Sequence, residues 1–456
     1  MKKIISFFAL ITIVINAFGQ IPDMETFVKK LTDSGSVYTQ KVQQWNNDTL
    51  IVLSQATNLS RCSFYLIDEV HNTVLQAMVE PSDTVKDFKV FNNTIWFCGS
   101  YSSMPGTYPL GFVANASLQD LFANQTYHLR YTKPMFSVDK IEICIDPNTH
   151  HTIICGIGIS GNVYPQAACF LHYDCIYDSA LVFTAPNTDE IYDDIVIKQD
   201  YSINNAFVVG RSSLFPTIAI LGIRNFNISN PYNNTGSYTN LSNITQGYFQ
   251  YPLVADSLIS KFIAVAGIIT NFNNFEEIDV FQIDVSSIQT PIITEGLFSE
   301  PYPIGAISIK DLMLYLGPNT HNYKLLALGN GPIFPNPNIF NFIVDIDFIN
   351  DSFDNIVNAY FSDQKILFNS FTKTNRQIII STGVSFGNNV INTFKTNPFR
   401  IRPNNCYNVS TFGIHKMNIG INPSSLMPIT NIEAAHYHWE YKHANVISQN
   451  INLICH

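Results

Sequence analysis

The sequence predicts an all-β protein, a seven-bladed β-propeller built from four-stranded antiparallel blades. Two repeated markers predict it, together with the lack of long helical periodicity after residue 36. The first marker is a glycine that ends a short apolar run, and it recurs after 57, 54, 57, 62 and 54 residues. These glycines are Gly99, Gly156, Gly210, Gly267, Gly329 and Gly383.

The second marker is an aspartate just after a hydrophobic residue, usually with one residue between them. It recurs at intervals of 52, 55, 62, 55 and 52 residues, in step with the glycines. The aspartates are Asp87, Asp139, Asp194, Asp256, Asp311 and Asp363. A weaker copy at 46–55 carries neither marker and is a degenerate first unit, which brings the expected number of blades to seven. Eight blades are the alternative, if the C-terminal part forms one more.

One unit illustrates the predicted blade. Segments 138–146, 152–160, 167–173 and 180–185 are short, rich in β-branched and aromatic residues, and separated by turn residues. Four such strands in roughly 50 residues match one propeller blade. A glycine on the second strand indicates that backbones crowd there or that the sheet bends.

The N-terminal segment predicts export. Residues 1–19 combine Lys2 and Lys3, an apolar run and a small-residue cleavage site, which together resemble a signal peptide of the Gram-negative type. We therefore expect a secreted, periplasmic or cell-surface protein. No later segment reaches the ~20 apolar residues that a transmembrane helix needs, so no transmembrane segment is expected.

The remaining chain divides into three parts. Residues 20–36 are an N-terminal lead-in, in which 24–31 has the only short helical pattern, and residues 37–400 form the propeller. Residues 401–456 differ in composition and either close the ring or form an extra blade.

Composition excludes one class of partner. The chain of 456 residues has a net charge of −10 and only 13% charged residues. Nucleic-acid binding requires clustered Lys and Arg, so no nucleic acid is expected. No nucleophile-elbow, zinc-protease or phosphate-loop motif occurs, and we expect a non-enzymatic protein without a cofactor.

The eight cysteines suggest disulfides, because an exported protein reaches an oxidising compartment. Cys144 and Cys155 are expected to face each other across the turn at 147–151, and Cys406 with Cys455 is the second choice. Buried free thiols are the alternative for each cysteine.

Two sets of residues are candidates for ligand binding. The repeated aspartates should begin the innermost strands and surround the mouth of the central channel. They either hold a structural cation or a basic ligand, or accept hydrogen bonds from local backbone. Metal binding is otherwise left open. The second set lies in long loops on the same face: Tyr101, Tyr108, Tyr164, Phe215, Phe272 and Phe334.

The unit resembles the loosely defined repeats of secreted bacterial β-propellers, over roughly residues 37–400. This resemblance supports the fold and implies no activity. We therefore expect a secreted propeller that binds a protein or polysaccharide through its loop-rich face. An extracellular glycan hydrolase or lyase, and a structural component of the cell envelope, are the alternatives.

Overall fold

The computed structural model describes the chain from residue 28 to residue 455, with gaps in connecting segments. The longer gaps are 33–36, 57–61, 69–72, 103–107, 162–166, 213–217, 257–260, 317–322, 332–341, 362–365, 374–378, 386–389, 397–407 and 435–438. The predicted signal peptide therefore lies outside the described residues. No helix in the described part of the chain has the length and apolar character needed to span a membrane.

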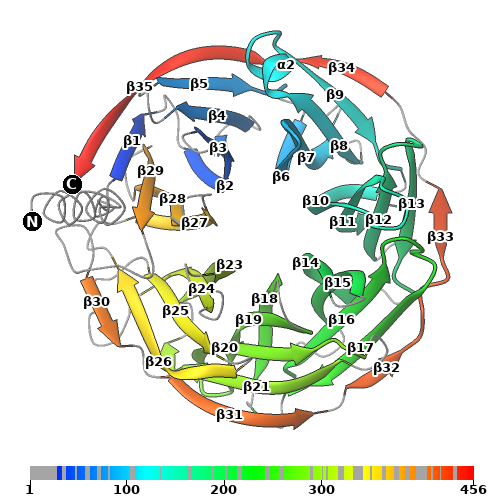
Figure 1. The fold of residues 1–456 in the computed structure, drawn as a ribbon, viewed down its shortest axis with the longest axis vertical. Coiled ribbons are helices and arrows are strands. Elements are labelled where there is room, and N and C mark those ends of the chain that lie inside the picture. The colour runs from blue at the N-terminus through cyan, green and yellow to red at the C-terminus, as the bar shows by residue number, and fades with distance from the viewer. Residues whose placement is uncertain are drawn as a thin grey trace, which may run out of the picture.

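The described strands form a ring of antiparallel sheets around a central channel (Figure 1). Five sheets present one inner strand to the channel and the nine-stranded sheet presents two, and successive strands step outward toward the rim. Four sheets follow one plan. They contain β6 (Asp83–Phe91), β7 (Thr94–Tyr101), β8 (Leu110–Ser117) and β9 (Thr126–Tyr131); β10 (Met135–Ile145), β11 (Thr152–Ser160), β12 (Ala168–Asp174) and β13 (Ser179–Thr184); β14 (Glu190–Asp200), β15 (Ile203–Ser212), β16 (Ile220–Asn227) and β17 (Asn234–Asn240); and β23 (Ser308–Leu316), β24 (Tyr323–Asn330), β25 (Phe342–Ile349) and β26 (Ser352–Phe361).

A fifth sheet has the same plan with one addition. It contains β18 (Tyr248–Asp256), β19 (Phe262–Thr270), β20 (Phe275–Asp284) and β21 (Ile292–Ser299), and the short β22 (Tyr302–Pro303) pairs with β20. A short helix, α2 (Leu118–Phe122), connects β8 to β9 and is capped by the Ser117 side chain.

The C-terminal segment runs around the outside of the ring as a series of edge strands (Figure 1). We call these strands the outer belt: β30 (Asn408–Thr411), β31 (Ile414–Ile421), β32 (Ser424–Leu426), β33 (Ile432–Ala434), β34 (Trp439–His443) and β35 (Asn445–Cys455). They pair in turn with β26, β21, β17, β13, β9 and β5. The belt thus gives most sheets a fifth strand and covers their outer edges.

The last sheet joins the two ends of the ring. It contains β2 (Val37–Asn46), β3 (Thr49–Ala56), β4 (Cys62–Asp68), β5 (Thr73–Met78), β35, β1 (Val28–Thr32), β29 (Val390–Thr396), β28 (Ile379–Ser385) and β27 (Ile366–Lys373). Because β35 pairs with both β5 and β1, strands from the two ends of the chain form one continuous nine-stranded sheet.

The predicted blade number and blade size are wrong. Counted as hydrogen-bonded sheets of described residues, the propeller has six blades, and its typical blade has five antiparallel strands. The extra strand comes from the outer belt, and the lower number arises because β35 merges the first and last repeats. The helical pattern at 24–31 was also misleading, since β1 is a strand between β29 and β35.

The core lies between neighbouring sheets, as layers of apolar side chains. One layer contains Phe64, Phe88, Phe97 and Phe112, all fully buried, whose rings meet edge to face. Such pairs stabilise the packing beyond the apolar area they bury.

Candidate functional site

Every inner strand has an irregularity in its pairing with the second strand. In the described register, one residue is skipped between Val85 and Asp87, between Tyr192 and Asp194 and between Ile309 and Asp311. Corresponding shifts occur in β2, β10, β18 and β27. These are β-bulges, which leave a residue unpaired and bend the strand.

The bulge explains the repeated glycine. A Cβ atom on Gly99 would lie 1.8 Å from the carbonyl oxygen of Thr84, and one on Gly210 would lie 1.8 Å from that of Ile191. These carbonyls belong to the residue two positions before the skipped one. The bulge therefore presses the inner strand against the second strand, and only glycine fits.

The six predicted glycines all lie on second strands, but they are not all equivalent. Gly99, Gly210, Gly329 and Gly383 pair with the residue just before the bulge, and Gly267 lies opposite the bulge. In the third unit the equivalent residue is Gly158, which pairs with Val138. A Cβ atom there would lie 2.0 Å from the Ser137 oxygen, whereas Gly156 has no contact closer than 3.2 Å.

The described aspartates line the central channel, a cavity of about 430 Å³. Asp87, Asp194 and Asp311 lie inside the inner strands just after the bulge, Asp139 is the skipped residue of the β10 bulge, and Asp256 is the last residue of β18. The prediction that they begin the inner strands is therefore wrong, because each strand starts before the bulge. Asp363 lies outside the described residues.

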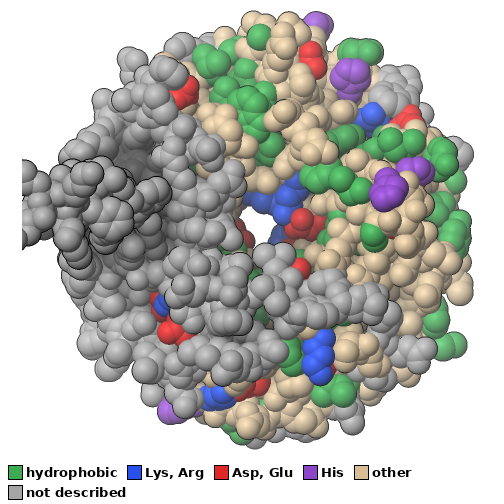
Figure 2. Space-filling view, in the orientation of Figure 1, with side chains coloured by type: hydrophobic (Ala, Val, Ile, Leu, Met, Phe, Trp, Pro, Cys, Tyr) green, Lys and Arg blue, Asp and Glu red, His purple; other side chains and the backbone are tan. Residues whose placement is uncertain are grey.

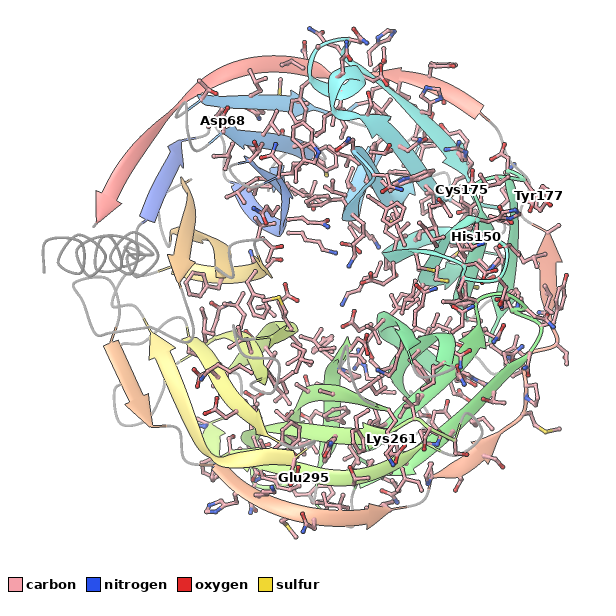
Figure 3. The ribbon with its side chains drawn as sticks, in the orientation of Figure 1. Asp68, His150, Cys175, Tyr177, Lys261 and Glu295 are labelled. Atoms are coloured by element: carbon pink, nitrogen blue, oxygen red, sulfur yellow. The ribbon has the colours of Figure 1, made fainter. Side chains whose placement is uncertain are left out.

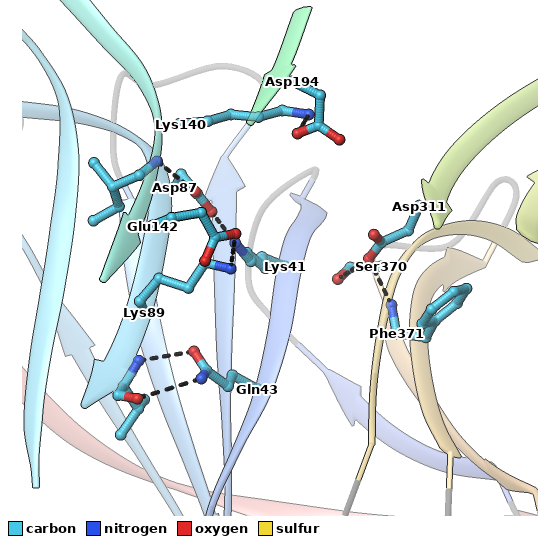
Figure 4. Close-up of polar contacts among 12 residues, drawn as sticks. Lys41, Gln43, Asp87, Lys89, Lys140, Glu142, Asp194, Asp311, Ser370 and Phe371 are labelled. Carbon is cyan, nitrogen blue, oxygen red and sulfur yellow. Dashed lines mark hydrogen bonds and ion pairs between the residues drawn. The ribbon is translucent and has the colours of Figure 1, made fainter. Parts of the chain in front are cut away.

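Three of the aspartates connect neighbouring sheets. Each is the first residue after its bulge, and each accepts a hydrogen bond from a backbone N–H of the next inner strand. The donors are Ile141 to Asp87 at 3.0 Å, Val254 to Asp194 at 2.9 Å and Phe371 to Asp311 at 3.1 Å. The expected backbone donors are thus confirmed for these three, and Figure 4 shows those of Asp87 and Asp311.

Lysines in the channel wall neutralise the acids. Lys41 pairs with Asp87, and Lys140 pairs with Asp194 at 2.8 Å. Three more pairs follow: Lys89 with Glu142, Lys86 with Asp139 and Lys198 with Asp256. The two signs meet at the edge of the central opening (Figure 2).

These ion pairs explain how several carboxylates can lie close together in the channel wall. Alternating Lys and Asp remove the mutual repulsion of the carboxylates. Although burial opposes the charged form of Lys89, Glu142 and Asp87 raise its pKa. Among the described residues no group of His, Cys, Asp and Glu is arranged to hold a metal ion. The sequence contained the lysines, several of them beside the aspartates, but a lone lysine is usually solvated.

The bulge of β18 differs from the others. It leaves Tyr251 and Pro252 unpaired between Gln250 and Leu253. Tyr251 has a positive φ of 47° and is 61% exposed. A left-handed conformation in a bulky residue is strained, by about 1–2 kcal/mol.

An arginine from the neighbouring sheet contacts this tyrosine. The Arg211 guanidinium carbon lies 4.6 Å from the centre of the Tyr251 ring, and its Nε donates to Asp193 Oδ2 at 3.1 Å. Asp193 is the skipped residue of its own bulge. Burial raises the pKa of Asp193 to about 6, although Arg211 opposes the shift.

Lys310 is the skipped residue of the β23 bulge and lines the channel. It is exposed, and the structure gives it no ion-pair partner among the described residues. Partial removal of water by the channel wall lowers its pKa. The other lysines that line the channel each have a carboxylate partner: Lys41, Lys86, Lys89 and Lys140.

The predicted aromatic residues have different environments. Tyr108 is 80% exposed with its ring stacked on Phe136, and Phe272 is 67% exposed. Tyr101 packs against Tyr131, and the Lys442 ammonium group lies 4.4 Å from its ring centre, so it belongs to the packed structure. Tyr164, Phe215 and Phe334 lie outside the described residues.

The expected bridge between Cys144 and Cys155 is not formed. Both are buried free thiols, and the register places Cys144 opposite Ile153 and Cys155 opposite Glu142. The prediction centred the hairpin on residues 149–150, but the observed pairing is centred one residue earlier. The side chains of Cys406 and Cys455 lie outside the described residues.

Comparison with known proteins adds no assignment. No protein-family model matches the chain, and no curated protein matches it significantly.

Proposed function

We propose that this protein is an exported, non-enzymatic propeller that binds a protein or polysaccharide through one face. That face carries the loops between second and third strands, together with the starts of the inner strands. The observation that carries the proposal is the set of exposed aromatic rings there. Tyr108 follows β7, Phe272 follows β19 and Tyr251 lies near the start of β18.

Aromatic side chains bury large areas when a partner covers them, and they are enriched where proteins recognise ligands. Loops held by a rigid scaffold are a common location for binding residues. Both arguments support this face as the binding surface.

The channel acids support binding over catalysis. A general acid or base needs a carboxyl group that is available to a substrate. Each described acid in the channel wall already has a lysine or a backbone N–H partner. Their ion pairs serve the contact between neighbouring sheets.

Export is part of the proposal and rests on residues 1–19, with their basic start, apolar run and small-residue site. A location outside the cytoplasm suits a protein that recognises an external macromolecule.

The test is a glycan-array and pull-down screen with the purified protein, repeated with two variants. Phe272→Ala should weaken binding to every ligand that the screen finds. Tyr177→Ala is the matched control, because Tyr177 is 72% exposed at the rim of the ring (Figure 3) and lies in the turn after β12, at the opposite ends of the strands. Equal effects of the two variants, or no ligand at all, would contradict the proposal.

A further inference from the structure

The repeat is broken in two neighbouring inner strands, at the bulge of each. In β18 the bulge exposes Tyr251, and in β23 it exposes Lys310. These inner strands are neighbours around the channel (Figure 1). Other bulges place residues there that are already paired, such as Lys86 with Asp139 and Asp193 with Arg211.

We propose that Tyr251 and Lys310 form a binding site for an acidic polysaccharide, one that carries carboxylate groups on its sugar rings. This inference rests on the proposed function and specifies its ligand class. Tyr251 supplies the stacking surface, and Lys310 supplies the charge.

Tyr251 is built as a rigid platform. The Arg211 guanidinium covers its ring at 4.6 Å and is itself fixed by Asp193. Pro252 restricts the following backbone. Because 61% of Tyr251 remains exposed, a sugar ring can stack its apolar C–H face on the tyrosine. The residue keeps a strained backbone, which is common where a side chain must be aimed at a ligand.

Lys310 supplies the cation. The channel lysines Lys41, Lys86, Lys89 and Lys140 each have a carboxylate partner. Lys310 has none among the described residues, and it is exposed toward the channel mouth. An ammonium group at a partly desolvated site binds a carboxylate more strongly than a fully solvated one does.

The arrangement favours a polysaccharide over a protein. Protein interfaces bury a contiguous surface with an apolar centre. Tyr251 instead stands as a single ring beside charged side chains. A few polar groups around one aromatic platform suit the recognition of a polar ring.

The experiment measures affinity for polygalacturonate by isothermal titration calorimetry, with hydroxyethylcellulose as a neutral polymer. We expect binding to polygalacturonate and a loss of at least about tenfold in Tyr251→Ala. Tyr251→Phe keeps the ring and should retain binding. Lys310→Gln should weaken polygalacturonate binding and reduce its dependence on salt.

Lys261→Gln is the matched control, since it removes the same charge at the opposite ends of the strands. Equal losses in the two lysine variants would overturn the inference, as would wild-type binding in Tyr251→Ala. Polyglutamate that competes equally well would assign the site to acidic peptides instead. If polygalacturonate does not bind while Phe272→Ala weakens other ligands in the screen, this inference fails and the proposed function stands.

Discussion

The inner ring and the outer belt hold the propeller together in different ways. In the inner ring, residues at repeated positions connect each sheet to the next, as Asp87 does with Ile141. In the outer belt, each contact occurs once. Lys442, 2% exposed, pairs with Asp83 at 3.3 Å, and Arg224 donates to the Met427 carbonyl at 2.7 Å.

The inner ring and the outer belt also differ in how much their ion pairs contribute to stability. The ring pair of Lys86 with Asp139 remains about one third exposed, so water weakens it. The belt pair of Lys442 with Asp83 is dry, and removing one partner leaves a buried charge. We infer that the first pair tolerates the loss of one partner and that the second does not.

Removal of the belt should have the largest effect. A chain ended at residue 407 loses β30 to β35 and exposes the outer edges of all six sheets. We expect aggregation and loss of a cooperative thermal transition by circular dichroism. A sharp transition near the wild-type temperature would contradict the structural importance of the belt.

Loss of one buried belt cation should come next. Lys442→Met removes the ammonium partner of the buried Asp83, which still accepts a hydrogen bond from Tyr127, and should cost about 3–5 kcal/mol in urea unfolding. Lys261→Met is the control, because its pair with Asp284 is half exposed on the lysine side and should cost at most about 1 kcal/mol. Similar costs for the two variants would remove the distinction between dry and wet pairs.

The ring is tested through its glycines. Gly158→Ala drives a Cβ atom into the Ser137 carbonyl and should destabilise the protein by about 2–3 kcal/mol. Gly156→Ala, two residues earlier on the same strand, should cost less than about 1 kcal/mol. If Gly156→Ala proves the more damaging, the assignment of the bulge in β10 is wrong.

The smallest expected effect is a pH dependence of the stability, caused by Asp193. The raised pKa of Asp193 means that the folded protein keeps this proton up to about pH 6, whereas the unfolded chain releases it near the ordinary value of 3.8. The folded state thus binds more protons in this window, and stability from this group falls as pH rises through it. Asp193→Asn has no such loss.

The stability of Asp193→Asn relative to wild type should therefore increase by about 1–2 kcal/mol between about pH 4 and pH 7. Urea unfolding at both pH values measures this difference. A constant difference, or one of opposite sign, would show that Arg211 fully compensates the buried carboxylate.

The ring was largely predictable from sequence, because its markers repeat. Glycine and aspartate both recur where a bulge bends the inner strand, so their spacing gave the propeller, the second strands and the channel position of the described acids. The spacing did not predict which residues pair across each hairpin. The hairpin register around Cys144 depends on the length and shape of the turn, which spacing alone does not determine.

The belt was not predictable for the opposite reason. Its strands β32 and β33 have three residues each and carry no marker. Such strands exist only because a sheet edge is present to pair with, and that edge is distant in sequence. The candidate site was missed in the same way. Tyr251 and Lys310 depart from the repeat, and departures cannot be recognised until the bulges are aligned.

The most direct test of the account is hydrogen–deuterium exchange with and without polygalacturonate. We infer that the ligand binds where the ring departs from its repeat, and that the belt is structural. We therefore expect slower exchange in the bulge regions of β14, β18 and β23, and no change in β30 to β35. Protection along the belt, or in the turns at the opposite ends of the inner strands, would contradict it.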